Sequence, residues 1–150
     1  MERRLKLWNI VKGGLAAGLV IIAVNMAAQA LLATRMQAEL DAWMPGTAER
    51  MQPSGMGPVA AGVAMKLVIG LVLVWLHAVA RARVGAGPRG ATTTALAVWV
   101  LGAIYFSDYP LTGMLSWGTY TLLESMQLLA FLAAAQAGAL VAETREVGTG

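Results

Sequence analysis

The sequence predicts an all-α fold, a membrane-spanning four-helix bundle. Of its 150 residues, 58% are hydrophobic and only 13% are charged, whereas globular proteins average about 45–50% apolar and about 25% charged residues. Four stretches with few or no charges reach the roughly 20 residues that a helix needs to cross a bilayer. They leave only short connections, so we expect residues 1–150 to form a single transmembrane domain.

The first predicted span covers about residues 10–33, and its central part carries no charge. The longest connection follows, at residues 34–57, and we place it outside the membrane. Its first part has apolar residues at helical spacing, namely Met36, Leu40, Trp43 and Met44. This pattern predicts an amphipathic extension of the first helix that lies on the membrane or caps the bundle, or alternatively docks a partner. After Pro45 we expect irregular chain.

Three further spans complete the bundle. The second covers about residues 58–80 and starts at Pro58, which fits a first helical turn because the missing N–H would have no partner there. The third covers about residues 91–109 and ends at a turn-forming segment rich in Pro, Thr and Gly. The fourth covers about residues 116–141. These lengths favour a membrane bundle over a soluble one, which would need polar outer faces.

The distribution of basic residues predicts the orientation. Eight of the eleven lysines and arginines fall on one side of the predicted bundle and two, Arg35 and Arg50, on the other. The eight are Arg3, Arg4, Lys6, Lys12, Arg81, Arg83, Arg89 and Arg145. The positive-inside rule therefore places both termini in the cytoplasm. The net charge of +3 then needs no nucleic acid, and Arg81, Arg83 and Arg89 are expected to contact lipid headgroups.

Polar residues inside the predicted spans form the most informative pattern. At about 1.5 Å per residue, Asn25, Lys66 and Glu124 all lie about 10–13 Å below the outer interface, on three different helices. Tyr105, Tyr120 and Gln127 fall near the same layer. Since charged groups in hydrocarbon usually face the bundle interior and pair, we expect a Lys66–Glu124 ion pair. The cluster would then fix helix packing, bind a small polar ligand or proton, or leave Lys66 reaching toward the interface.

Small residues predict where helices approach closely. Gly14 and Gly18 form a Gly-x-x-x-Gly motif in the first span, and the fourth span carries a run of alanines with Gly138. Small residues let two backbones come close where lipid provides no hydrophobic driving force. The motif predicts a helix contact, either within the chain or between subunits.

Several kinds of chemistry are not expected. The chain has no cysteine and one histidine, His77, which we place near the inner interface with access to water. The letters of residues 85–90 match Gly-x-Gly-x-x-Gly, but that fingerprint binds dinucleotides only after a strand, and here it joins two membrane helices. No catalytic or metal-binding spacing is present, so we expect no enzyme activity, no metal and no cofactor.

Three segments together resemble a group of small bacterial four-helix membrane proteins without an assigned function. They are residues 13–18, residues 74–88, and Trp117-Gly118 ahead of Glu124. The resemblance implies a bacterial inner membrane location and no catalytic residues. We therefore expect a non-catalytic accessory or structural subunit, in contact with lipid and with other membrane subunits or further copies of itself. The alternative is a small-solute transporter or ligand-binding bundle with a polar site around Lys66 and Glu124.

Overall fold

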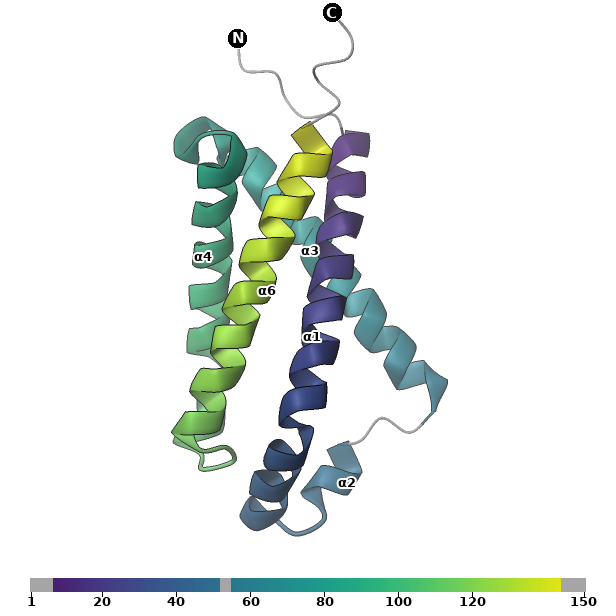
Figure 1. Ribbon diagram of the computed structural model, residues 1–150, viewed down its shortest axis with the longest axis vertical. Helices are drawn as coiled ribbons and strands as arrows, with labels where there is room; N and C mark the ends of the chain where they lie inside the picture. Colours follow the sequence, from purple (N-terminus) through teal and green to yellow (C-terminus); the bar gives the residue numbers. More distant parts are fainter. Residues whose placement is uncertain (1–6, 52–54, 144–150) are drawn as a thin grey trace, which may run out of the picture.

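The computed structural model describes residues 7–51 and 55–143 and confirms the all-α bundle. Within these ranges every regular element is a helix (Figure 1). They are α1 (Leu7–Trp43), α2 (Thr47–Met51), α3 (Met56–Val84), α4 (Gly87–Phe106), α5 (Asp108–Leu111) and α6 (Trp117–Glu143). Four apolar helices, α1, α3, the α4–α5 segment and α6, are long enough to cross a membrane. The protein is therefore a multi-pass membrane protein.

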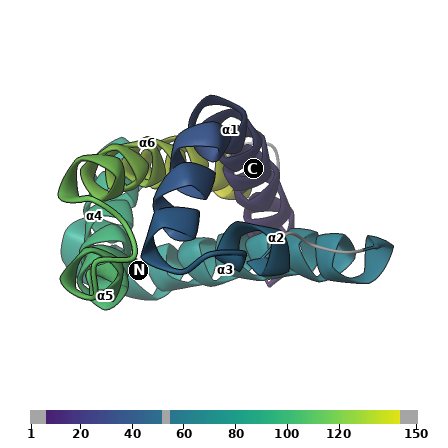
Figure 2. The same cartoon turned by 90° about the horizontal axis from the view of Figure 1, so that it is seen from below.

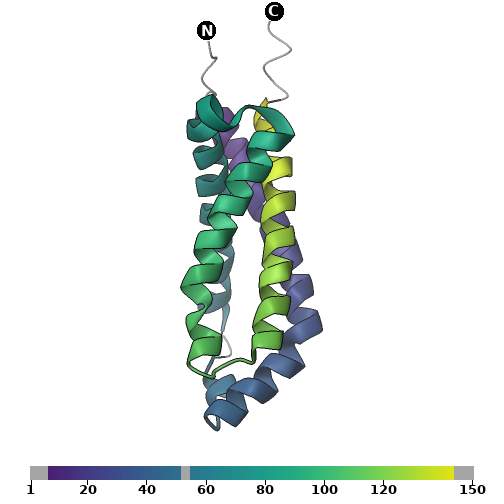
Figure 3. The ribbon, with the colours of Figure 1, turned by 90° about the vertical axis from the view of Figure 1, so that its left-hand side faces the viewer.

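The start of α1 and the end of α6 lie at the same end of the bundle, which we call the inner end (Figure 1 and Figure 3). The outer end holds α2 and the α5–α6 connection. This arrangement agrees with the predicted even number of crossings. The basic residues Arg3, Arg4, Lys6 and Arg145, which carry part of the orientation prediction, lie outside the described residues.

Helix α1 is longer than predicted because the amphipathic extension continues it without a break to Trp43. Its 37 residues would measure about 55 Å, well beyond the roughly 30 Å of bilayer hydrocarbon. The extension packs at the outer end, where Leu40 is buried with Ala48 and Leu115. It thus caps the bundle, and α2 forms a short helix in the segment that we expected to be irregular.

The core lies in the inner half, where α1 packs against α6 and α3. Small residues dominate it: Ala17, Ala91, Ala134 and Ala142 are fully buried. A Cβ added to Gly13 would lie 2.5 Å from the Gly138 carbonyl oxygen, so these two helices touch through their backbones. Dispersion between closely packed backbones therefore holds the inner half together.

Helix α3 crosses α1 at the Gly-x-x-x-Gly motif. A Cβ on Gly14 would come within 2.6 Å of the Leu71 Cα, and one on Gly70 would overlap the backbone of both Gly14 and Gly18. From this contact toward its start, α3 leans away from the other helices (Figure 1), and seen from below it projects beyond them (Figure 2). The outer half of α3 consequently packs less closely on the other helices: Met56 is 80% exposed, and a Cβ added to Gly57 or Gly62 would meet nothing within 4 Å.

The turn between α3 and α4 is shorter than the glycine-rich motif suggested. Gly85 ends α3 with a φ of 87°, and α4 already begins at Gly87. A left-handed φ favours glycine because it has no Cβ to clash with the backbone. The later glycine of the motif, Gly90, is buried inside α4, so only the first two residues form the connection.

Candidate functional site: a polar layer beside an open cleft

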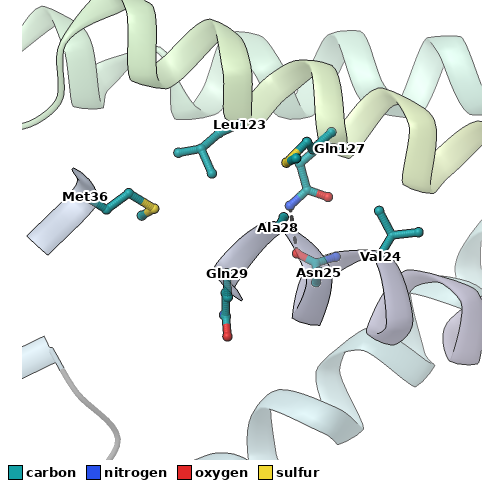
Figure 4. Close-up of a pocket in the computed structure, with 8 residues that line it drawn as sticks. Val24, Asn25, Ala28, Gln29, Met36, Leu123 and Gln127 are labelled. Atoms are coloured by element: carbon teal, nitrogen blue, oxygen red, sulfur yellow. Dashed lines mark hydrogen bonds between the residues drawn. The ribbon is translucent and has the colours of Figure 1, made fainter. Parts of the chain in front are cut away.

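Asn25 and Gln127 form the centre of the predicted polar layer. The Gln127 side-chain amide donates a 3.1 Å hydrogen bond to Asn25 Oδ1, and Asn25 Nδ2 donates to the Ile21 carbonyl at 2.9 Å. In Figure 4 the two side chains point toward each other between α1 and α6. They line a cavity of about 200 Å³ together with Val24, Ala28 and Leu123. The layer therefore joins α1 to α6 by a polar contact within the apolar part of the bundle.

The predicted Lys66–Glu124 ion pair is not formed. Among the described residues neither side chain takes part in an ion pair, although both are half-buried and line one cavity of about 280 Å³. The cavity lies where α3 leans away, and we call it the outer cleft. Its lining comes from four helices: Ile21 and Asn25, Gly62 and Lys66, Trp99 and Gly102, Glu124 and Gln127, with Met65, Ile69, Phe106 and Phe131. One basic and one acidic residue thus line the same open space.

The remaining members of the predicted layer differ in burial. Tyr120 is half-buried and its hydroxyl donates to the Ala103 carbonyl, which joins α6 to α4. Tyr105 was predicted wrongly as a member of the buried cluster: it is 75% exposed on the outer surface of α4, where its ring contacts Phe106. Trp99 joins the layer instead, since its indole N–H donates to the Glu124 carbonyl at 2.9 Å.

A second polar cluster lies at the inner end, where the sequence indicated none. Glu143 Oε1 lies 3.3 Å from His77 Nε2, 3.3 Å from the Gly87 backbone nitrogen and 3.8 Å from Arg81 Nε. One carboxylate therefore joins the end of α6 to α3 and supplies an acceptor to the first turn of α4. A negative charge there also interacts favourably with the helix dipole.

This inner cluster corrects two predictions. His77 is only 2% exposed and has no water-exposed edge. Arg81 Nε lies 3.8 Å from Glu143 and the Arg81 side chain is only 20% exposed, whereas Arg83 and Arg89 are exposed at the inner end. The sequence reasoning missed Glu143 because it ended the last helix at residue 141. The signal was a carboxylate one turn beyond the alanine run, close in depth to a histidine and an arginine.

A third cluster at the outer end centres on Glu39. Its carboxylate accepts hydrogen bonds from the Ser116 backbone N–H at 2.7 Å, the Ser116 hydroxyl at 2.9 Å and the Thr119 hydroxyl at 2.6 Å. Arg35 Nε lies 3.3 Å away on the same helix. Glu39 therefore caps the start of α6 from the extension of α1, outside the predicted span.

The surroundings of Glu39 change its titration. Desolvation raises the pKa of this carboxyl, but hydrogen bonds from Thr119, Ser116 and Arg35 outweigh it and lower the pKa to about 2. Donors aimed at a carboxylate favour its charged form. Glu39 consequently stays ionised at all physiological pH values.

Within the described part of the chain, no group of three or more His, Cys, Asp or Glu side chains could hold a metal ion. Comparison with protein families, with curated proteins and with solved structures finds no match for this chain.

Proposed function

We propose that this protein is a non-catalytic accessory or structural subunit of a larger membrane assembly, and that the outer cleft and the outer half of α3 form its docking surface. The observation that supports this is that Lys66 and Glu124 have no ion-pair partner within residues 7–51 and 55–143 and line an opening in the apolar part of the bundle. An ionisable group in hydrocarbon without a partner costs several kcal/mol. A neighbouring helix that closes the cleft removes this cost.

The outer half of α3 supports the same proposal. Met56, Val59, Val63 and Met65 are between 41% and 80% exposed, and Cβ atoms added to Gly57 and Gly62 would meet nothing within 4 Å. Lipid can cover apolar side chains, but small residues allow the close backbone approach by which membrane helices associate. This half of α3 offers such a face without using it inside the bundle.

Cross-linking tests the docking surface. Because the chain has no cysteine, Val63→Cys introduces one reactive thiol, and Leu101→Cys on the exposed face of α4 is the matched control. We expect a thiol-reactive cross-linker in native membranes to give a discrete adduct from Val63→Cys and none from Leu101→Cys. Equal labelling without any adduct at either position would contradict the proposal.

A second candidate function is binding or transport of a small polar solute. It rests on Lys66 and Glu124 lining one cavity from opposite helices. The volume of about 280 Å³ is just below the range of about 300–1,000 Å³ of small-molecule pockets. A chain that purifies alone in mild detergent with a small molecule bound in the outer cleft would favour this candidate over the first.

The proposed location is a bacterial inner membrane with both termini in the cytoplasm. It rests on the basic residues and on the sequence resemblance. Single cysteines test it: we expect a membrane-impermeant maleimide to label Glu49→Cys on α2 in intact cells, and Arg83→Cys only after the membrane is opened. Both side chains are exposed. The opposite labelling pattern would invert the topology.

A further inference from the structure

We propose that the partner seated in the outer cleft is a second copy of this chain, related by a two-fold axis normal to the membrane, with Lys66 of each copy paired with Glu124 of the other. This inference rests on the proposed function and names its partner. It starts from charge: the cleft presents one cation and one carboxylate, and in the described residues neither has an ionic partner.

Such a surface is complementary to itself. In a two-fold interface the same patch meets its own copy, so a residue i that contacts j also gives a contact from j to i. One Lys66–Glu124 contact between copies therefore produces two. Both unpaired charges are satisfied at once, without any charge left over in the apolar region.

The depths of the two residues also fit this symmetry. A two-fold axis normal to the membrane keeps every residue at its own depth, so only groups at a common depth can pair. Lys66 and Glu124 line the same cavity, and the rise per residue predicts that both lie about 10–13 Å below the outer interface. An axis lying in the membrane plane would instead bring inner and outer ends together, which membrane insertion forbids.

The shape of the bundle explains why the pair forms between copies and not within one. Helix α3 is fixed against α1 at Gly14, Gly18 and Gly70, where the backbones touch. Closing the cleft from within would require α3 to rotate about this contact. On the inner side of the contact, α3 is already held in the core by its own Leu73 and Val74. In the dimer that we propose, the projecting α3 of the second copy lies across the opening of the outer cleft, and neither bundle has to rearrange.

Exchange of charges tests the inference. Donor and acceptor dyes are attached at Glu49→Cys on two populations, and energy transfer is measured in liposomes over a series of protein dilutions. We expect specific transfer for the unaltered pair, a dissociation constant raised at least about tenfold by Lys66→Glu or by Glu124→Lys alone, and no change for the exposed control Arg50→Glu.

Mixing the two single variants decides between pairing within and between chains. A heterodimer of Lys66→Glu with Glu124→Lys places a glutamate opposite a lysine at both contacts, so we expect mixing to restore transfer. If energy transfer returns in the double variant Lys66→Glu/Glu124→Lys but not on mixing the single variants, the pair forms within one chain and the inference is overturned. Neutral Lys66→Met and Glu124→Met, which should fold as the parent does, are expected to weaken the dimer less than the charge reversals.

Two outcomes separate this inference from the proposed function. Transfer that falls to the level of random proximity on dilution would show that no second copy binds, yet Val63→Cys could still cross-link to a different protein, and the docking role would stand. Energy transfer that neither charge reversal changes would mean that Lys66 reaches the membrane–water interface by itself, and the inference would be wrong.

Discussion

Removing the Glu143 carboxylate should separate the inner ends of three helices. In the folded chain this group meets His77, Arg81 and the first N–H of α4. Two atoms in the same place already lack a partner among the described residues, His77 Nδ1 and one Arg81 terminal nitrogen. Glu143→Ala would also remove the partner of His77 Nε2 and of Arg81 Nε.

The magnitude follows from burial. Breaking a fully buried ion pair costs about 3–5 kcal/mol, and Glu143 and Arg81 are 23% and 20% exposed, which lowers the figure. Hydrogen bonds to charged groups contribute about 1.5–3 kcal/mol. We therefore expect Glu143→Ala to lower the free energy of unfolding by about 2–3 kcal/mol.

Reversible unfolding in mixed micelles, followed by tryptophan fluorescence, measures this change. Glu49→Ala is the matched control, because Glu49 is exposed on α2, and a surface substitution of this kind stays within about 0.5 kcal/mol. In a double-mutant cycle with His77→Ala we expect a coupling of about 1–2 kcal/mol. Strict additivity, or equal effects of the Glu143 and Glu49 variants, would refute the assigned contact.

Three further expectations concern other parts of the chain. The pKa of Glu39 falls to about 2 on folding, so the contribution of this carboxylate to stability is complete above the unfolded value of 4.5 and is lost as the pH drops toward 2. Over that range, unfolding curves should show the wild type losing about 1–2 kcal/mol more stability than Glu39→Gln, after allowance for the partial exposure of Glu39. Gly70→Ala should destabilise by about 1–3 kcal/mol, since the new Cβ meets backbone that cannot move cheaply, whereas Gly57→Ala on the same helix should not. Asn25→Leu should cost about 0.5–1.5 kcal/mol by leaving the Gln127 amide without its partner, and adding Gln127→Leu should recover most of that loss; a further loss in the double variant would argue against the hydrogen bond.

The sequence predicted the four crossings because hydrophobic length is a direct property of the chain. It also predicted that several polar residues share one layer, since rise per residue is constant along a helix. Asn25 and Gln127, which it placed in one layer, do meet. Depth, however, does not determine the rotation of a helix about its axis, and Tyr105, which was expected in the same layer, faces outward.

Tilt was the second missing quantity. Lys66 and Glu124 line one cavity, but α3 leans away from the other helices on the outer side of its contact at Gly70 (Figure 1). The ion pair that depth alone suggested does not form among the described residues. The motif at Gly14 and Gly18 predicted a contact but not its angle. The inner cluster was missed for a simpler reason, because two residues of helix beyond the expected end bring Glu143 to His77.

The caps supplied by neighbouring helices have a consequence for biogenesis. The first N–H of α4, at Gly87, is satisfied by Glu143, which is synthesised 56 residues later. The start of α6 depends in turn on Glu39, made 77 residues before Ser116. Individual helices of membrane proteins insert first and associate afterwards. The start of α4 must therefore wait for the last helix to emerge from the ribosome, so the inner end becomes complete only when translation of the whole bundle is finished.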